Sequence, residues 1–130
     1  MTDEKLKYLL VLPNLSDLSL TKTRITEAGL ESIKENKIIS LELDGTFVTN
    51  KAIKVLQGWK HLRFLNISYT KINRDAIPDL LKLKLQSIEV AGLNFSESDI
   101  KRLEQKGISV RNEEYEIQCP GTADSKCPEF

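Results

Sequence analysis

Only three residues of this 130-residue chain are cysteine or histidine, the types that most often serve as nucleophiles, bases or metal ligands: His61, Cys119 and Cys127. Cys119 and Cys127 lie eight residues apart near the C-terminus. They are either joined in a disulfide, which would close a small loop, or are two free thiols. Structural zinc takes four ligands and no histidine lies near these cysteines, so we expect no metal site.

His61 lies in the stretch GWKHLRF, where we expect a surface loop. A catalytic histidine needs a nucleophile and an orienting partner. The chain has no nucleophile elbow, no G-x-G-x-x-G motif and no Walker loop, and nothing in the sequence pairs its acidic residues. We therefore predict that the chain is not an enzyme and takes no cofactor.

The composition is that of an ordinary globular domain, with 40% hydrophobic and 29% charged residues and a formal net charge of zero. A neutral chain has no global attraction to nucleic acid. No stretch approaches the ~20 apolar residues of a membrane span. The localisation stays open: cytoplasmic if the chain is complete, and secreted or periplasmic if a leader was removed and the two cysteines are joined.

Four stretches of the chain resemble one another: residues 15–26, 38–49, 62–73 and 85–96. When they are aligned, residues of one kind fall in columns that are 23 or 24 residues apart. The apolar columns are Leu18, Leu41, Leu65, Ile88; Leu20, Leu43, Ile67, Val90; Leu30, Ile53, Ile77, Ile100; and Ile33, Leu56, Leu80, Leu103.

Each repeat has two halves with different periods. The first half alternates apolar and polar residues, as in Leu18-Ser19-Leu20, which predicts a short strand with one buried face. The second half places apolar residues three apart, which predicts a helical turn or two. Between the halves lies a column of good helix N-cap residues: Thr26, Thr49, Asn73 and Ser96.

The pattern of residues 15–30, LSDLSLTKTRITEAGL, resembles the leucine-rich repeat, in a bacterial form with Thr where many members carry Asn or Cys. The resemblance covers about residues 2–110. It implies an α/β solenoid, a horseshoe arc with a short parallel sheet on its concave face and short helices on its convex face. Two positions depart from the pattern. Where the first repeat has Gly29, the second and third repeats have Ala52 and Ala76. Where the first three repeats have Thr23, Thr46 and Thr70, the fourth has Leu93, so the fourth repeat should lack the hydrogen bond from this threonine to the loop backbone.

This interpretation divides the chain into three parts. Residues 1–14 form a helical half-repeat, because Thr2, Leu6 and Leu9 precede the matching residues of the first repeat by 24 positions. Residues 15–110 hold four repeats and a fifth short strand near Ile108 and Val110. Residues 111–130 form a C-terminal cap or partly disordered tail, in which residues 115–117 would add a closing strand. The first half-repeat is either a native cap or the sign of a longer repeat protein.

Trp59 invites interpretation as a binding residue, because tryptophan is common at interaction hot spots. It lies three residues after Leu56 and three before Leu62, in the slot that Leu12 occupies earlier in the chain. We therefore expect Trp59 to pack in the core.

Residues between the apolar strand positions should face outward on the concave side. We expect a protein partner there, held by aromatic anchors within an acidic ring. The alternative for Phe64 is that it only packs sideways on neighbouring strands. The candidate binding residues are Asp17, Ser19, Glu42, Asp44, Phe64, Asn66, Tyr69 and Glu89.

The predicted function is therefore a protein-interaction module that binds another protein of unknown identity. This face lacks the Lys/Arg cluster that phosphate binding needs, so we expect no nucleic-acid partner. One alternative is a structural or assembly segment, in which the open edge of the first strand, near residues 17–21, pairs with another copy. Another is the recognition arm of a larger leucine-rich-repeat protein, such as an effector or the substrate receptor of a ubiquitin ligase.

Overall fold

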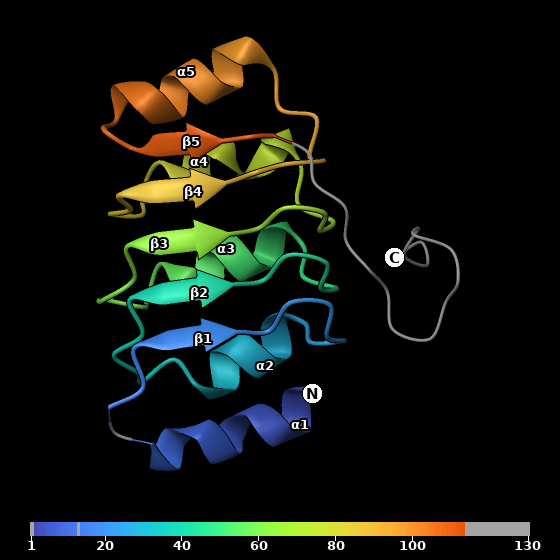
Figure 1. Ribbon diagram of the computed structural model, residues 1–130, viewed down its shortest axis with the longest axis vertical. Coiled ribbons are helices and arrows are strands. Elements are labelled where there is room, and N and C mark those ends of the chain that lie inside the picture. Colours follow the sequence, from blue (N-terminus) through green and yellow to red (C-terminus); the bar gives the residue numbers. More distant parts are fainter. Residues whose placement is uncertain (1, 13, 114–130) are drawn as a thin grey trace.

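The computed structural model describes residues 2–12 and 14–113, which form one parallel sheet with short helices packed beside it (Figure 1). The sheet has five strands in the order in which they occur in the chain. The strands are β1 (Asp17–Ser19), β2 (Ser40–Glu42), β3 (Phe64–Asn66), β4 (Ser87–Glu89) and β5 (Ser109–Arg111). Cys119, Cys127 and the predicted strand at 115–117 lie outside the described residues.

A helical segment precedes each strand, and all of them are short (Figure 1). None of the helices in the described part of the chain is long and apolar enough to cross a membrane. The segments are α1 (Asp3–Leu6), which runs into the 3-10 helix η1 (Lys7–Val11), then α2 (Glu27–Ser32), α3 (Asn50–Leu56), η2 (Arg74–Ala76), α4 (Ile77–Leu80) and α5 (Glu97–Gln105).

The strands pair in the register of the aligned sequence columns. Asp17, Ser40, Phe64, Ser87 and Ser109 are successive Cα partners across the sheet. Residues that occupy one column of the sequence therefore form one row across the strands. The fifth strand is found where its apolar residues predicted it, whereas the first strand ends at Ser19 rather than near residue 21.

The apolar columns form the core between the sheet and the helices. Leu41, Leu65 and Ile88 in the strands and Leu30 and Ile53 in the helices are all at most 3% exposed. Trp59 is 4% exposed, so its predicted place in the core is confirmed. Leu12, in the matching slot of the N-terminal segment, is instead 50% exposed.

All four predicted N-cap residues cap a helix. The side chains of Thr26, Thr49 and Asn73 each accept a hydrogen bond from the backbone N–H two residues on, at 3.3, 3.3 and 2.9 Å. The Ser96 hydroxyl accepts from the Asp99 N–H at 3.2 Å, and the Asp99 carboxylate accepts from the Ser96 N–H at 3.1 Å, which completes a capping box.

The first residue of a helix also tethers the N-cap of the next. The carboxylate of Asp3 accepts from the Thr26 N–H at 2.8 Å and from its hydroxyl at 2.6 Å. Glu27 accepts from the Thr49 N–H and hydroxyl, and Asn50 Oδ1 accepts from the Asn73 N–H at 2.9 Å. These bonds join successive helices, and α1, with Leu6 fully buried, covers the apolar end beside α2.

The threonine column behaves as predicted. The hydroxyls of Thr23, Thr46 and Thr70 donate to the backbone carbonyl three residues earlier, at 2.7, 2.6 and 2.7 Å. Leu93, at the same position in the fourth unit, has no hydroxyl to donate, and its side chain is 7% exposed. Its backbone N–H still reaches the Val90 carbonyl at 3.3 Å, so the turn is kept without the side-chain bond.

A left-handed backbone residue lies after each of the first four strands. Lys22, Gly45, Tyr69 and Gly92 have φ of 60°, 72°, 56° and 75°, and they are again 23 or 24 residues apart. A residue with this φ turns the chain sharply from the strand toward the helix layer. The alternation of inward and outward side chains therefore ends where the strand does.

Candidate functional site

The sheet face that the helices leave uncovered carries a shallow hollow of about 370 Å³. It spans strands β2 to β5. Ten residues line it: Ser40, Leu41, Glu42, Phe64, Leu65, Asn66, Ser87, Glu89, Ser109 and Arg111. Below, "open face" means the face of the sheet that holds this hollow.

Phe64 is the large apolar side chain of the open face. It begins β3, and its Cα partners on both sides are serines, Ser40 and Ser87. Serine offers little apolar surface, so the neighbouring strands do not cover the ring, which remains 40% exposed. The sideways packing that we considered from the sequence thus leaves much of the ring in solvent.

Glu42 and Glu89 flank the centre of the hollow from β2 and β4. Glu42 Oε2 lies 3.3 Å from the Ser19 hydroxyl and 3.4 Å from that of Thr21. The Thr21 hydroxyl has one proton and lies closer to Asp44, at 2.8 Å, so Glu42 is held only weakly. Its carboxylate is exposed and available to a ligand.

Asn66 lies between these glutamates in the same row, but it is only 8% exposed. Its Oδ1 accepts from the Ser68 N–H at 3.0 Å, which turns the amide toward the end of its own strand. Ser68 is fully buried and its hydroxyl accepts from the Ala91 N–H at 2.9 Å, linking two units. Asn66 thus lines the hollow while also fixing the local backbone.

The four other predicted residues do not line the hollow. Asp17 and Ser19 are exposed on β1, outside the lining residues. Asp44 is 5% exposed and accepts from the Thr21 hydroxyl, so it offers a partner little surface. Tyr69 lies in the turn after β3, where its ring stands close to Gly92.

Arg111 is a residue of the open face that the sequence analysis missed. It is exposed on β5, and its Cα partner is Glu89. A guanidinium in this row offsets part of the acidic charge that we expected there. The signal was present, because Ile108 and Val110 had been assigned to a fifth strand, and the outward columns extend to Ser109 and Arg111.

The groups of the open face suit non-covalent contact. They are one aromatic ring, two carboxylates, one guanidinium, an amide and several hydroxyls. Within residues 2–12 and 14–113, no three His, Cys, Asp or Glu side chains lie close enough together to hold a metal ion. His61 is exposed in the loop before β3, away from this hollow.

Comparison with known proteins identifies the fold but no family. No family model matches the chain, and no curated protein matches it. Among solved structures, the chain is similar to one described as leiomodin-1 actin-binding site 2, with a TM-score of 0.61. The two are 13% identical in sequence, and the match covers 85% of this chain and 78% of that one. At this identity the similarity is one of fold.

Proposed function

We propose that this chain is a protein-interaction module that holds its partner on the open face of the sheet. The observation that carries the proposal is the Phe64 ring, 40% exposed among small and charged side chains. An aromatic side chain of this kind, surrounded by polar groups, is typical of an interaction anchor. In this proposal, Glu42, Glu89 and Arg111 provide the polar rim.

We also propose that the architecture is a leucine-rich-repeat solenoid, with the open face as its concave side. The pairing of each strand with the next in the register of the sequence columns supports this, as does the threonine-to-carbonyl bond that recurs in three successive turns. In such a solenoid each unit covers its neighbour's apolar edge, and the inner face is left for a partner.

The test is an affinity pull-down that compares the wild-type chain with a variant carrying Phe64→Ala, Glu42→Lys and Glu89→Lys. All three side chains reach solvent, so the variant should fold, which circular dichroism would verify. A partner that binds the open face should be captured by the wild type and lost with the variant, because the variant removes the anchor and reverses the rim charge.

A control with the same change of charge alters two exposed residues on the helix side: Glu31→Lys in α2 and Glu104→Lys in α5. This variant should capture the same partner as the wild type. Equal capture by all three proteins would refute the open face as the binding site. Actin deserves inclusion as a purified bait, because the similar solved structure is described as an actin-binding site.

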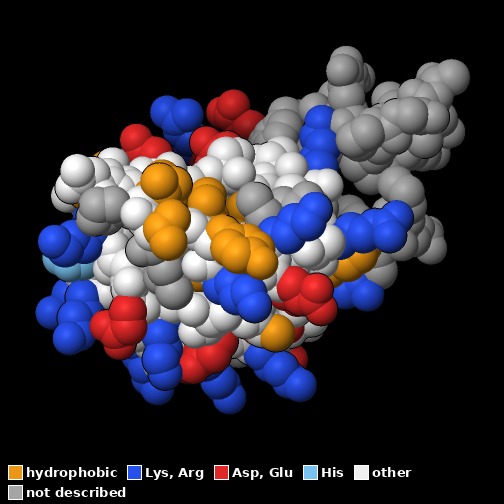
Figure 2. All heavy atoms as spheres, turned by 90° about the horizontal axis from the view of Figure 1, so that it is seen from below, with side chains coloured by type: hydrophobic (Ala, Val, Ile, Leu, Met, Phe, Trp, Pro, Cys, Tyr) orange, Lys and Arg blue, Asp and Glu red, His pale blue; other side chains and the backbone are white. Residues whose placement is uncertain are grey.

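A second candidate function is self-association through the N-terminal end. Within the described residues, the outer edge of β1 pairs with no strand. Nearby, Tyr8, Val11 and Leu12 are 66%, 77% and 50% exposed. Viewed from this end, apolar side chains gather near the middle of the surface (Figure 2). An edge strand beside exposed apolar side chains is a template for pairing.

Sedimentation over a range of concentrations tests this self-association. A dimer that Val11→Glu abolishes would support self-association, and a monomer at every concentration would rule it out.

A further inference from the structure

The loops that lead from the helices into strands β2 to β5 hold seven of the 18 Lys and Arg residues in the described part of the chain, but only one of its 15 acidic residues. We call them the return-loop edge: residues 33–39, 57–63, 81–86 and 106–108. They hold one acidic residue, Glu35. Their seven Lys and Arg residues are Lys34, Lys37, Lys60, Arg63, Lys82, Lys84 and Lys106. In a chain with no net charge, this concentration makes the edge a distinct electrostatic surface.

The stacking of the strands aligns three of these lysines with the single histidine, which the formal charge counts as neutral. Lys37, His61, Lys84 and Lys106 each lie three residues before a strand, at one register position, and all four are exposed. The backbone ladder extends into the loops, where the Arg63 N–H donates to the Ile39 carbonyl at 2.8 Å. Neighbouring strands lie about 4.8 Å apart, so the column brings basic side chains close together. Lys and Arg side chains gather at the corresponding left edge of Figure 2.

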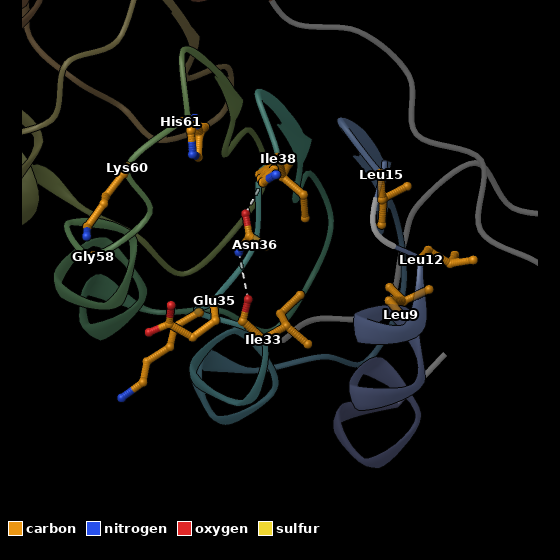
Figure 3. A pocket seen from close by; sticks show the side chains of 12 residues that line it. Leu9, Leu12, Leu15, Ile33, Glu35, Asn36, Ile38, Gly58, Lys60 and His61 are labelled. Atoms are coloured by element: carbon orange, nitrogen blue, oxygen red, sulfur yellow. Dashed lines mark hydrogen bonds between the residues drawn. The ribbon is translucent and has the colours of Figure 1, made fainter.

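A hollow of about 460 Å³ lies at the N-terminal end of this edge (Figure 3). Leu9, Leu12 and Leu15 approach it from the N-terminal segment, and Ile33 and Ile38 lie across from them. On the other side the rim is polar and mainly basic: Lys34, Glu35, Asn36, Lys37, Lys60 and His61.

Asn36 holds the loop of this hollow in place. Its Nδ2 donates to the Ile33 carbonyl at 2.6 Å, and its Oδ1 accepts from the Ile38 N–H at 2.8 Å (Figure 3). The apolar floor is thus preformed rather than assembled by a ligand, which lowers the entropic cost of binding.

A second hollow, of about 190 Å³, adjoins the first through Lys60. Its lining residues include four basic side chains and no acidic one: Lys60, Arg63, Lys82 and Lys84. Arg63 is held by its bond from Nη1 to the Leu62 carbonyl at 2.8 Å. Lys82 is partly compensated by Asp79, whose Oδ1 lies 3.8 Å from its Nζ. An anionic group in this hollow would still meet an excess of positive charge.

Trp59 also lines the second hollow. Its indole Nε1–H is buried and, within the described residues, has no hydrogen-bond partner. A buried donor without an acceptor costs about 1–3 kcal/mol, and natural structures contain few of them. Trp59 therefore places an unusual buried donor in the wall of the second hollow.

We propose that the return-loop edge is a second binding surface, and that it takes an extended acidic protein segment. An apolar side chain of the segment enters the hollow between Leu12 and Ile38, and its neighbouring carboxylates lie over Lys60, Arg63 and Lys84. Nucleic acid has no aliphatic side chain for the apolar floor, and a flat lipid surface would not fill a hollow. Both the charge and the shape therefore favour a peptide.

Trp59 is the only tryptophan of the chain, so its fluorescence reports on this site directly. The probe is a blocked glutamate-rich peptide with one central leucine, titrated into the full-length chain. We expect a saturable change in Trp59 emission that added salt weakens. A peptide with lysine in place of glutamate, and one with serine in place of the leucine, should each bind at least about tenfold more weakly. No saturable change, or equal binding of the three peptides, would overturn the proposal.

Charge reversal localises the effect. The Lys60→Glu, Lys84→Glu variant should bind the glutamate peptide at least about tenfold more weakly. The matched Arg24→Glu, Lys71→Glu variant changes two exposed cations in the turns at the other end of the strands, and it should stay within about twofold of the wild type. Equal weakening in both would reduce the effect to overall charge and overturn the proposal.

Competition settles the class of partner. If a DNA duplex or a vesicle containing phosphatidylserine bound at a lower concentration than the glutamate-rich peptide and displaced it, the partner would not be an acidic protein segment. The surface is separate from the open face, so the Phe64→Ala, Glu42→Lys, Glu89→Lys variant should keep the peptide. Failure of one proposal can thus be distinguished from failure of the other.

Discussion

The residues just beyond the strands show how strongly a single backbone angle constrains the side chain. At this position two units have Gly45 and Gly92, and two have Lys22 and Tyr69, all with positive φ. Glycine adopts this conformation without strain, whereas other residues incur a cost of about 1–2 kcal/mol. Gly92 has a second constraint, because a Cβ there would lie 2.6 Å from Tyr69 Cδ1.

We predict that Gly92→Ala lowers the free energy of unfolding by about 2–4 kcal/mol, through backbone strain and overlap with Tyr69. Gly107 has φ of 93°, and a Cβ there would meet no atom of the described residues within 4 Å. Gly107→Ala should therefore lower the free energy of unfolding only by the cost of backbone strain, about 1–2 kcal/mol. Urea denaturation measures both. In a Tyr69→Asn background, Gly92→Ala and Gly107→Ala should lower the free energy of unfolding by similar amounts. If Gly92→Ala remained the more destabilising change there, overlap with the Tyr69 ring would not be the cause.

The helices are too short to be stable alone, at four to nine residues. Their caps and the tethers between them therefore matter more than helix propensity. The best example is the capping box of α5, in which the Asp99 side chain is almost fully buried. The hydrogen bond that the Asp99 carboxylate accepts from the Ser96 N–H lowers the pKa of Asp99 below its ordinary value of 3.8. Burial opposes this shift, and the Ser96 hydroxyl and Arg74 add smaller decreases.

We predict that Asp99→Ala destabilises the chain at neutral pH, and that the difference from wild type disappears in acid. Because the folded pKa is depressed, the ionised carboxylate stabilises the fold above 3.8, and that contribution is lost as the pH falls through the folded pKa. Denaturation curves at a series of pH values measure the difference.

Glu97→Ala changes an exposed acidic residue of the same first turn and is the control. Its difference from wild type should be smaller throughout, since it is not part of the capping box. An Asp99→Ala deficit that stayed constant into strong acid would show that the carboxylate charge is not responsible.

Across the described residues, the sheet is a row of five strands in which each strand pairs only with the strands next to it in the chain. The central strand β3 pairs on both sides, whereas β1 and β5 pair on one side within the described residues. Opening therefore costs least at the two ends of the row.

We predict a gradient of amide exchange along the sheet. The amides of Leu41 in β2 and Leu65 in β3 should exchange most slowly, and those of Leu18 in β1 and Val110 in β5 faster, by at least about tenfold. Hydrogen–deuterium exchange followed by NMR measures this. Uniform protection across the five strands would mean that the sheet opens only as a whole, contrary to this expectation.

Local features of the fold were predictable because local chemistry decides them. The side chains of Thr26 and Thr49 each cap the helix that follows them in the chain. The alternation of apolar and polar residues from Leu18 to Leu20 decides which face of the strand is buried. The same alternation wrongly predicted that Asp44 faces outward. Asp44 is buried, because β2 ends at Glu42 and the chain turns at Gly45.

The sequence alone determined the strand–helix period, the buried columns, the helix caps and the place of Trp59 in the core, because each depends on residues near one another in the chain. Only the tertiary structure decided which outward residues share a surface. It placed Arg111 beside Glu89, and it stacked loops with one or two Lys or Arg residues each into a single basic edge. Pairing in register brings together charges that lie 22 to 24 residues apart in the chain, and no single strand–helix segment shows their sum.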